Sequence, residues 1–579
     1  MFKRLKLLLN KIPTITVDRF KFIVVMTIIL VLIENIPSFI NRFNVNEYNN
    51  YTTWYNIYSL TIESLMASAL TLAVLFLVSC NKYLLKLVVV LFLCISSIFI
   101  YILVSYKVII NEVLFVSLMQ ANDGETQEMI TWVPVAIFIF LGALPSLFII
   151  FCVKIKSNIN SIKDCFYGYF WESLLKKIVI FICIPIIVML LLVLFGNRAL
   201  FFNTYNVKTS LSGYMPLNYI GGYYQYITKL SRDVKIAKNI KELSSKYKFS
   251  FNSALKEEPL TVVLVIGESS RAKSQAYNGY YRDTNKYTKN INGLVYLKDV
   301  KSCATYTIGS VPCMLSHLTR KEFSLPTRET GLISVFKDLG FKTYWISTQT
   351  AYSSGLNAIF RSATEASEFY FINSVRPYVP SGGQVYDDIT ATTLVKEAID
   401  SPHKQKLIVF QLFSSHIKYK ERFPEEFMIY TPSCKLNSSN CGDIALQNDY
   451  DNATVYNDYV LSLVINQLKD KNALLIYMSD HGESLPTDKS GFLFHNATYN
   501  IAPPEQTHVA ALMWLSDGMQ KLLPGAIDNV RKYANLHISH DYIFSTLLGC
   551  IGVKSQVINN NLNLCLPNGL PNAKSGKYY

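Results

Sequence analysis

The stretch Thr261-Val-Val-Leu-Val-Ile-Gly-Glu-Ser-Ser-Arg271 decides the fold of the larger part of the chain. Its run of apolar and β-branched residues ends at a glycine, which predicts a buried strand. Glu268 is the carboxylate that leaves this strand, and a carboxylate in that position is a reasonable metal ligand. The position alone is weak evidence, because a glutamate at a strand end is more often a turn residue or a helix cap.

Similar apolar runs recur through the polar two-thirds of the chain, where short β-branched runs alternate with segments of helical character. Further strands are expected at Lys342–Ile346, Leu407–Phe413, Ala473–Met478 and Val509–Leu515, and helices at Gly331–Leu339, Ile389–Asp400 and Asp451–Lys469. This alternation predicts an α/β domain with a mostly parallel central sheet flanked by helices. Ligands of such sheets gather at the carboxyl ends of the strands.

Residues suited to metal binding follow several of these strands. Asp480 and His481 come directly after Ala473–Met478 and can address one divalent cation, such as zinc. His416 ends another strand and His495 follows a glycine-bearing loop. One histidine alone is more often structural, but the whole set predicts a metal-and-hydroxyl site. The other histidines are expected to be structural, surface or packing residues, with His508 supporting the site from outside: His317, His403, His508, His537 and His540.

The hydroxyl of this site is expected in Cys303-Ala-Thr-Tyr-Thr307-Ile-Gly-Ser-Val-Pro-Cys313. If the two cysteines pair, the loop is held in one shape. Pro312 limits how far a following helix extends backwards, because a helix tolerates proline only in about its first turn. A threonine just ahead of that helix would lie beside unsatisfied N–H groups, a good place for phosphate. Thr307 is therefore the candidate nucleophile, although the stretch also suits a structural loop.

Charge and cysteine content restrict the partners and the compartment. The net charge of +14 indicates an anionic partner, and the long apolar runs favour a membrane surface over nucleic acid. No C-x-x-C spacing supports a metal–thiolate site. Six cysteines of the polar two-thirds have spacings that allow local pairing, which suits an oxidising compartment such as the bacterial periplasm: Cys303, Cys313, Cys434, Cys441, Cys550 and Cys565.

The first third of the chain is apolar. A helix needs about 20 residues to cross a bilayer, and five stretches qualify: Phe22–Ile40, Ile57–Ser79, Leu87–Tyr106, Trp132–Val153 and Ile178–Phe195. Basic residues gather before the first stretch, between the second and third, and between the fourth and fifth. The positive-inside rule then puts the N-terminus in the cytoplasm and everything after about Asn197 outside.

We therefore expect three parts: a five-span membrane domain over residues 1–197, a connector over 198–258, and a catalytic domain over 259–579. The connector mixes aromatic and basic residues, which predicts either an interfacial segment or a linker packed on the soluble domain. Its stretch Lys235–Lys248 is expected to be a helical connector.

Taken in order, these segments resemble the membrane phosphoethanolamine transferases of Gram-negative bacteria, which have the alkaline phosphatase/sulfatase-like fold. The resemblance covers nearly the whole chain, including the five spans, and the cysteine-framed threonine loop is its most specific part. The matching pieces are Val265–Arg271, Tyr277–Asn285, Cys303–Met314, Ser415-His416, Ser479–Ser484 and Pro504–Gln506.

The resemblance implies a chemistry for these residues. Thr307 would accept phosphoethanolamine from phosphatidylethanolamine, release diacylglycerol and pass the group to lipid A, lipopolysaccharide core or periplasmic glucan. The zinc ligands would be Glu268, Thr307, Asp480 and His481. His416 and His495 would contact the transferred group or a second zinc, with one of them as general acid, and Thr305 would help hold the phosphate. The expected enzyme is a monomer of the bacterial inner membrane that binds no nucleic acid.

Two departures weaken assignment to the lipid A-specific branch: Gln411 stands where the family often has a histidine, and Tyr352–Ala363 contains no cysteine. A phosphoglycerol transferase of the lipoteichoic-acid type is the nearest alternative, although the framed loop and the Cys434/Cys441 pair count against it. A plain sulfatase would need C-x-P-x-R, which this loop lacks. An inactive membrane sensor or scaffold is the remaining alternative.

Overall fold

The structure is a computed structural model, and its chain divides into two compact units, Met1–Thr228 and Lys229–Tyr579. Each unit is considered by itself. The structure describes residues 13–40, 53–79, 81–106, 110, 114–115, 132–156, 214–237, 239–349, 358–372, 387–434, 441–488, 490, 492–497 and 499–567.

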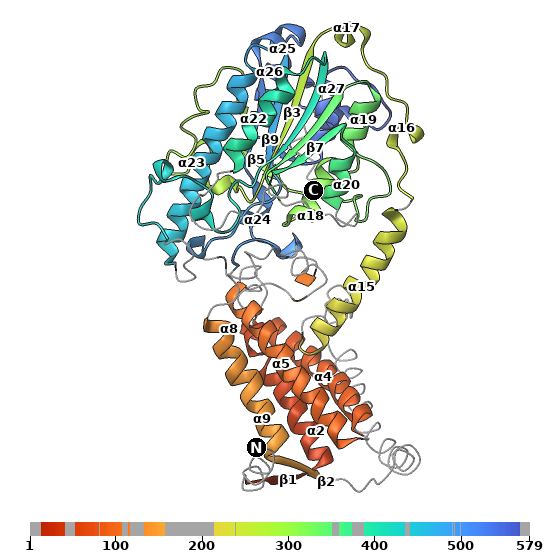
Figure 1. The fold of residues 1–579 in the computed structure, drawn as a ribbon, viewed down its shortest axis with the longest axis vertical. Coiled ribbons are helices and arrows are strands. Elements are labelled where there is room, and N and C mark those ends of the chain that lie inside the picture. The colour runs from red at the N-terminus through yellow and green to blue at the C-terminus, as the bar shows by residue number, and fades with distance from the viewer. Residues whose placement is uncertain are drawn as a thin grey trace, which may run out of the picture. The chain divides into compact units, whose positions relative to one another are not determined.

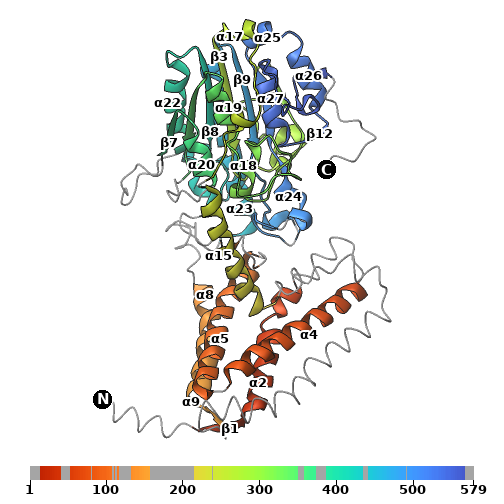
Figure 2. The same cartoon turned by 90° about the vertical axis from the view of Figure 1, so that its right-hand side faces the viewer.

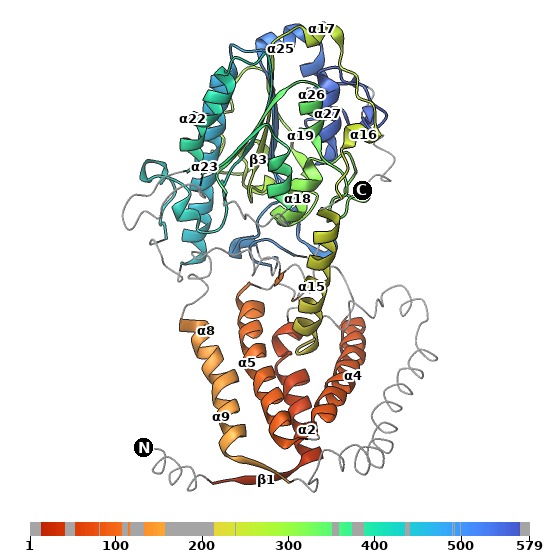
Figure 3. The same ribbon diagram turned by 45° about the vertical axis from the view of Figure 1, so that its right-hand side comes forward.

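The first unit is helical (Figure 3). Its elements are α2 (Arg19–Ile28) with the π-helical turn η1 (Ile29–Ile33), α4 (Thr53–Val78), α5 (Lys82–Tyr106), α8 (Trp132–Ile137), η2 (Phe138–Ala143) and α9 (Leu144–Phe151). Within the described residues, three stretches are long and apolar enough to cross a membrane: Arg19–Ile40, Lys82–Val104 and Trp132–Phe151. A shorter apolar helix covers Glu63–Val78. The fifth predicted span, Ile178–Phe195, lies outside the described residues.

Side chains from four helices form the core of this unit, among them Leu30, Leu75, Val89 and Ile149. Short parallel strands, β1 (Ile15–Asp18) and β2 (Val153–Lys156), pair beside the ends of α2 and α9.

The connector segment also begins within the first unit. The buried Asn35 side chain clamps the backbone of Met215, donating to its carbonyl at 3.0 Å and accepting from its N–H at 2.9 Å. Helix α15 (Leu217–Ala237) follows. The expected helix over Lys235–Lys248 is wrong in extent, because α15 ends at Ala237 and only the short α16 (Leu243–Lys246) follows.

A seven-stranded sheet forms the centre of the second unit (Figures 1 and 2). Its order is β4 (Leu294–Tyr296), β11 (Ala511–Leu515), β9 (Ala473–Ser479), β3 (Leu260–Gly267), β8 (Gln405–Gln411), β6 (Lys342–Ser347) and β7 (Glu368–Phe371). The strands from β9 to β7 pair in parallel, whereas β11 runs antiparallel to both of its neighbours. The α/β class is confirmed, with a mixed sheet.

The predicted strand Val509–Leu515 is divided in the structure. β10 (His508–Val509) pairs with β5 (Asp299–Lys301) in a second sheet that also contains β12 (His537–Ser539), and β11 begins only at Ala511. A continuous apolar run predicts burial well, but it does not reveal that the chain changes sheets at Ala510.

Helices cover both faces of the main sheet (Figures 1 and 2). α22 (Asp387–Asp400) and α23 (Asp443–Leu468) pack on one face, and α19 (Leu332–Asp338), α26 (Ala526–Tyr533) and α27 (Tyr542–Cys550) on the other. Alternate residues of β3 serve the two cores: Val263 faces the α22 side and Leu264 the α19 side, both fully buried. This two-sided burial explains why strand sequences here are continuously apolar.

Short elements and disulfides complete the unit. The disulfides join Cys303 to Cys313, Cys434 to Cys441 and Cys550 to Cys565, in line with the local pairing that the spacings allow. The short helices are α17 (Ser253–Lys256), α18 (Thr307–Met314), α20 (Ala358–Thr364), α24 (Pro504–Thr507) and α25 (Asp517–Leu522). The 3-10 turns are Ala272–Ser274, Ala276–Asn278, Tyr419–Glu421, Glu425–Phe427, Pro486–Asp488, Tyr499–Ile501 and Asn560–Leu562.

The carboxylate of Glu365 gives this unit a pH-dependent stability. It accepts the Gly331 N–H at 2.9 Å and the Ser334 N–H at 3.3 Å at the start of α19, and burial raises the pKa of Glu365 from 4.5 to about 7. The unfolded chain releases this proton at lower pH than the folded chain, so stability is lost as pH rises from about 4.5 to 7.

We expect the Glu365→Gln variant to lack this loss. Between pH 4.5 and 7.5 the wild type should lose up to about 3 kcal/mol of unfolding free energy relative to the variant. Denaturant titrations of both proteins at the two pH values measure the difference. A pH-independent difference would contradict the assigned pKa of Glu365.

Candidate active site

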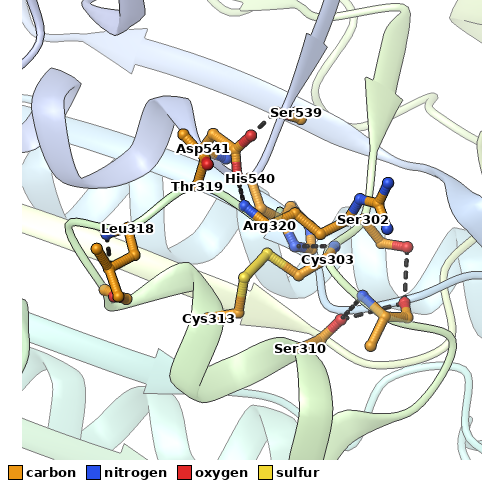
Figure 4. The surroundings of a disulfide bond; sticks show 12 residues. Ser302, Cys303, Ser310, Cys313, Leu318, Thr319, Arg320, Ser539, His540 and Asp541 are labelled. Atoms are coloured by element: carbon orange, nitrogen blue, oxygen red, sulfur yellow. Dashed lines mark hydrogen bonds between the residues drawn. A yellow bond between two sulfur atoms is a disulfide. The ribbon is translucent and has the colours of Figure 1, made fainter. Parts of the chain in front are cut away.

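Thr307 stands at the start of α18, after Tyr306 in extended conformation. The disulfide between Cys303 and Cys313 ties the preceding loop to the helix (Figure 4). The expectation that Pro312 would keep the helix from extending back is wrong, because α18 begins five residues before Pro312 and includes it. Thr307 is therefore the first residue of the helix and does not precede it.

Two parallel strands bring the acidic residues to the threonine. β3 and β9 are neighbours in register, with Gly267 opposite Ser479, so the residues that follow them emerge side by side. Glu268 Oε1 lies 3.1 Å from His481 Nε2, and Asp480 Oδ2 lies 3.5 Å from the same nitrogen. Thr307 Oγ1 lies 3.1 Å from Glu268 Oε2 and 3.2 Å from His481 Nε2. The structure thus gathers the four predicted zinc ligands.

This cluster fits a divalent metal ion. The ligand atoms of Glu268, Asp480 and His481 lie within 4.8 Å of one another, and all three residues are buried. Asp480 Oδ2 is buried and has no hydrogen-bond partner among the described residues. Burial and the neighbouring Glu268 raise the pKa of Asp480, while Asp480 and Glu268 outweigh burial and raise the pKa of His481 to about 10. The cluster therefore holds protons at neutral pH that a divalent cation would replace.

Two further histidines lie beside the cluster. The ring centre of His495 is 4.5 Å from that of His481 and 5.9 Å from that of His416. His495 Nδ1 donates a hydrogen bond to Glu483 Oε2 at 3.0 Å. His416 stacks on Phe413 with 5.0 Å between ring centres, and its Nδ1 has no hydrogen-bond partner in the described part of the chain. Burial lowers the pKa of His416 to about 3, so this imidazole is neutral at physiological pH.

The other predicted residues have different surroundings. The hydroxyl of Thr305 donates to the Ala497 carbonyl at 2.5 Å, which ties the threonine loop to the segment of His495. Gln411 accepts a hydrogen bond from Ser347 Oγ at 3.0 Å. His508 bonds the Lys298 carbonyl at 2.7 Å.

Sequence reasoning gave no role to two residues that contact this site. Glu483 is fully buried, holds His495 and accepts a hydrogen bond from the Tyr419 hydroxyl at 3.1 Å. Its position in Asp-His-Gly-Glu was a usable signal. Gln349 donates to Glu268 Oε2 at 2.8 Å from the loop after β6, where nothing in the sequence marked it.

Comparison with known families agrees with this geometry. Residues 260–553 match the family model "Sulfatase", which is about half of the chain, and this protein belongs to the sulfatase family. Residues 68–230 match a second model, described as "Phosphoethanolamine transferase EptA/EptB". The resemblance to the membrane phosphoethanolamine transferases is thereby confirmed.

Individual relatives extend the comparison. Phosphoethanolamine transferase EptA of Escherichia coli K12 is 33% identical over 310 residues, covering 52% of this chain and 54% of that protein. This match spans about half the length of that relative. EptA of Salmonella typhimurium LT2 is 28% identical over 470 residues, covering 79% and 80%. The solved integral membrane lipooligosaccharide phosphoethanolamine transferase A of Neisseria meningitidis superposes with a TM-score of 0.76 at 25% identity, covering 94% and 97%.

Proposed function

We propose that this protein is an enzyme that transfers phosphoethanolamine from phosphatidylethanolamine to an acceptor of the bacterial cell envelope. The observation that carries the proposal is the hydroxyl of Thr307, which lies 3.1 Å from Glu268 and 3.2 Å from His481 beside the buried carboxylate of Asp480. A hydroxyl in such a cluster is placed for nucleophilic attack on phosphorus. The similarity to named phosphoethanolamine transferases supplies the group that is transferred.

Zinc is the metal we propose, held by Glu268, Thr307, Asp480 and His481. Two carboxylates, an imidazole and a hydroxyl form a mixed oxygen and nitrogen set that suits this ion. When bound, zinc would lower the pKa of the threonine hydroxyl and neutralise charge on the phosphoryl oxygens.

The transfer then takes two steps. Thr307 Oγ1 gives up its proton to solvent and attacks the donor phosphorus, the bond from phosphorus to the diacylglycerol oxygen breaks, and phosphoethanolamine remains on the threonine. An oxygen of the acceptor next attacks this phosphothreonine, the bond from phosphorus to Thr307 Oγ1 breaks, and the threonine oxygen takes a proton from solvent. Thr305 supports the site from the same loop, because its hydroxyl ties that loop to the Ala497 carbonyl.

We assign the general acid to His495. Its Nδ1–H is held by Glu483 at 3.0 Å, so the Nε2–H of the doubly protonated ring would go to the departing diacylglycerol oxygen, and Nε2 would then take a proton from the acceptor. His416 is the weaker candidate, because burial lowers its pKa to about 3 and keeps the ring neutral. His416 instead contacts the phosphoethanolamine group.

The membrane placement follows from the donor. Phosphatidylethanolamine is embedded in a bilayer, so an enzyme that consumes it benefits from apolar helices in the same chain. We place residues 1–197 in the inner membrane with five spans, residues 198–258 in the connector, and residues 259–579 in the periplasm, as a monomer. Lipid A, lipopolysaccharide core and periplasmic glucan are all acceptors of suitable chemistry.

Reconstitution of the full chain tests this function. Each reaction should contain one acceptor (lipid A, lipopolysaccharide core or periplasmic glucan) and vesicles with either phosphatidylethanolamine or phosphatidylglycerol as donor, with zinc present. We expect diacylglycerol release and added phosphoethanolamine mass only with phosphatidylethanolamine. Release only from phosphatidylglycerol would favour the phosphoglycerol transferase, and release from neither donor with any of the three acceptors would favour an inactive scaffold.

A further inference from the structure

The imidazole of His540 connects two backbone segments that flank the site. The side chain follows β12 and is 1% exposed, so of the two expected assignments, surface or packing, the structure supports packing. Its Nδ1 lies 3.1 Å from the backbone nitrogen of Cys303, and its Nε2 lies 2.9 Å from the carbonyl oxygen of Ser479. Figure 4 shows His540 beside Cys303 and the disulfide.

The two partners allow one state of the ring. An amide N–H only donates and a carbonyl only accepts, so Nδ1 must be the acceptor and Nε2 must carry the proton. A doubly protonated ring would set its Nδ1–H against the Cys303 N–H. Burial lowers the pKa of His540 to about 3, in agreement with a neutral ring.

Each end of this connection controls one half of the site. Cys303 starts the loop that reaches Thr307 four residues later, and its disulfide to Cys313 fixes the same loop to α18. Ser479 ends β9 directly before Asp480. The position of the nucleophile and the position of the carboxylate therefore both depend on backbone that His540 holds.

Ser479 extends the connection to the remaining ligands. Its hydroxyl donates to the His481 carbonyl at 2.9 Å and accepts the Ser270 N–H at 2.8 Å, and Ser270 is two residues after Glu268. Ser479 and His540 together thus connect the Glu268 segment, the Asp480–His481 segment and the threonine loop by hydrogen bonds. A displacement of about 1 Å at such a site can cost about 100-fold in rate.

We propose that His540 is a positioning residue that sets the distance between Thr307 and the metal-binding carboxylates by bridging Cys303 and Ser479. His540 itself touches neither substrate nor metal. The inference rests on the proposed function for its effect on rate, but the bridge itself can be tested without any turnover.

Variants of the full chain separate the bridge from simple packing. His540→Phe keeps the ring volume and removes both hydrogen bonds. His540→Asn offers an oxygen near Nδ1 for the Cys303 N–H, and His540→Gln offers an amide nitrogen near Nε2 for the Ser479 carbonyl. His537→Phe is the matched control, because His537 begins β12, just before His540, has a side chain that is 36% exposed and pairs with Asp299 at 3.0 Å.

Two measurements are needed: the kcat and KM of diacylglycerol release, and hydrogen–deuterium exchange of peptides covering residues 303–313 and 479–481. For His540→Phe we expect kcat to fall 10- to 100-fold at nearly constant KM and zinc content, with faster exchange in both peptides. His540→Asn should restore slow exchange mainly in the first peptide and His540→Gln mainly in the second, each with partial recovery of kcat. His537→Phe should match the wild type.

The outcomes distinguish the two proposals. Unchanged exchange in both peptides of His540→Phe overturns the bridge, whether or not the protein is active. A fall in kcat that only parallels a loss of folded protein, measured by thermal unfolding, also overturns it. If His540→Phe speeds exchange in both peptides but the wild-type protein transfers no phosphoethanolamine, the bridge is supported and the proposed function is rejected.

Discussion

Replacement of Thr307 by alanine is expected to abolish phosphoethanolamine transfer, with kcat at least about 10⁴-fold below the wild type. The alanine lacks the oxygen that forms the covalent intermediate. Without that intermediate, the phosphoethanolamine group cannot be passed to the acceptor. Because Thr307 is the first residue of α18 and its hydroxyl bonds Glu268 and His481 at the site, the fold should survive the change. Diacylglycerol release and product mass in the reconstituted system measure the effect.

Thr307→Ser is the matched variant, since it keeps the hydroxyl and removes one methyl group. Its kcat should stay within about 100-fold of the wild type, and a brief incubation with donor but no acceptor should add the mass of phosphoethanolamine to the peptide from residues 303–313. Transfer by the Thr307→Ala protein at more than about 1% of the wild-type rate would rule out Thr307 as the nucleophile.

The acidic residues and the histidine of the ligand cluster could be predicted as candidates because they follow strands. Glu268 and Asp480 both leave apolar runs, and parallel neighbours deliver such residues to the same end of a sheet. In the structure Gly267 lies opposite Ser479, and this register brings Glu268 and Asp480 to 3.1 and 3.5 Å from His481 Nε2. Strand ends marked Glu268, Asp480 and His481 as candidates, and the resemblance to the phosphoethanolamine transferases joined them with Thr307 as ligands of one zinc ion.

The supporting residues could not be predicted in this way. His540 is 237 positions from Cys303 and 61 from Ser479, and its role depends on the second sheet, in which β12 pairs with β5. The change of sheet at Ala510 was equally invisible, because Val509, Ala510 and the residues of β11 form one buried apolar run. These features depend on pairing between residues far apart in the chain, and such pairing cannot be read from a single sequence. Helix α18 shows a smaller failure: a proline rule for isolated helices did not hold for a helix anchored by the disulfide at Cys313.

Replacement of Asp480 by asparagine should have opposite effects on activity and on the stability of the metal-free protein. Asparagine keeps the shape but offers a weaker, uncharged ligand, so zinc affinity and kcat should each fall by about 10³-fold, the equivalent of about 4 kcal/mol. Without metal, the wild type must bury Asp480 beside Glu268, and this raises the pKa of Asp480 well above its usual range. The variant escapes that cost, so its melting temperature in chelator should exceed that of the wild type.

Asp458→Asn is the control for this experiment. Asp458 is also a buried acid whose pKa burial raises, to about 6, but it accepts N–H groups of Tyr287 and Thr288 and takes no part in the cluster. Zinc titrations, kcat and melting curves with zinc or chelator should show unchanged zinc affinity for this control. If Asp480→Asn bound zinc as tightly as the wild type, the Asp480 carboxylate would not be a zinc ligand. If the variant melted at a lower temperature in chelator, this carboxylate would not destabilise the metal-free protein. The combination matters most, because a carboxylate that destabilises the metal-free protein and also holds zinc is expected of a site that an ion completes.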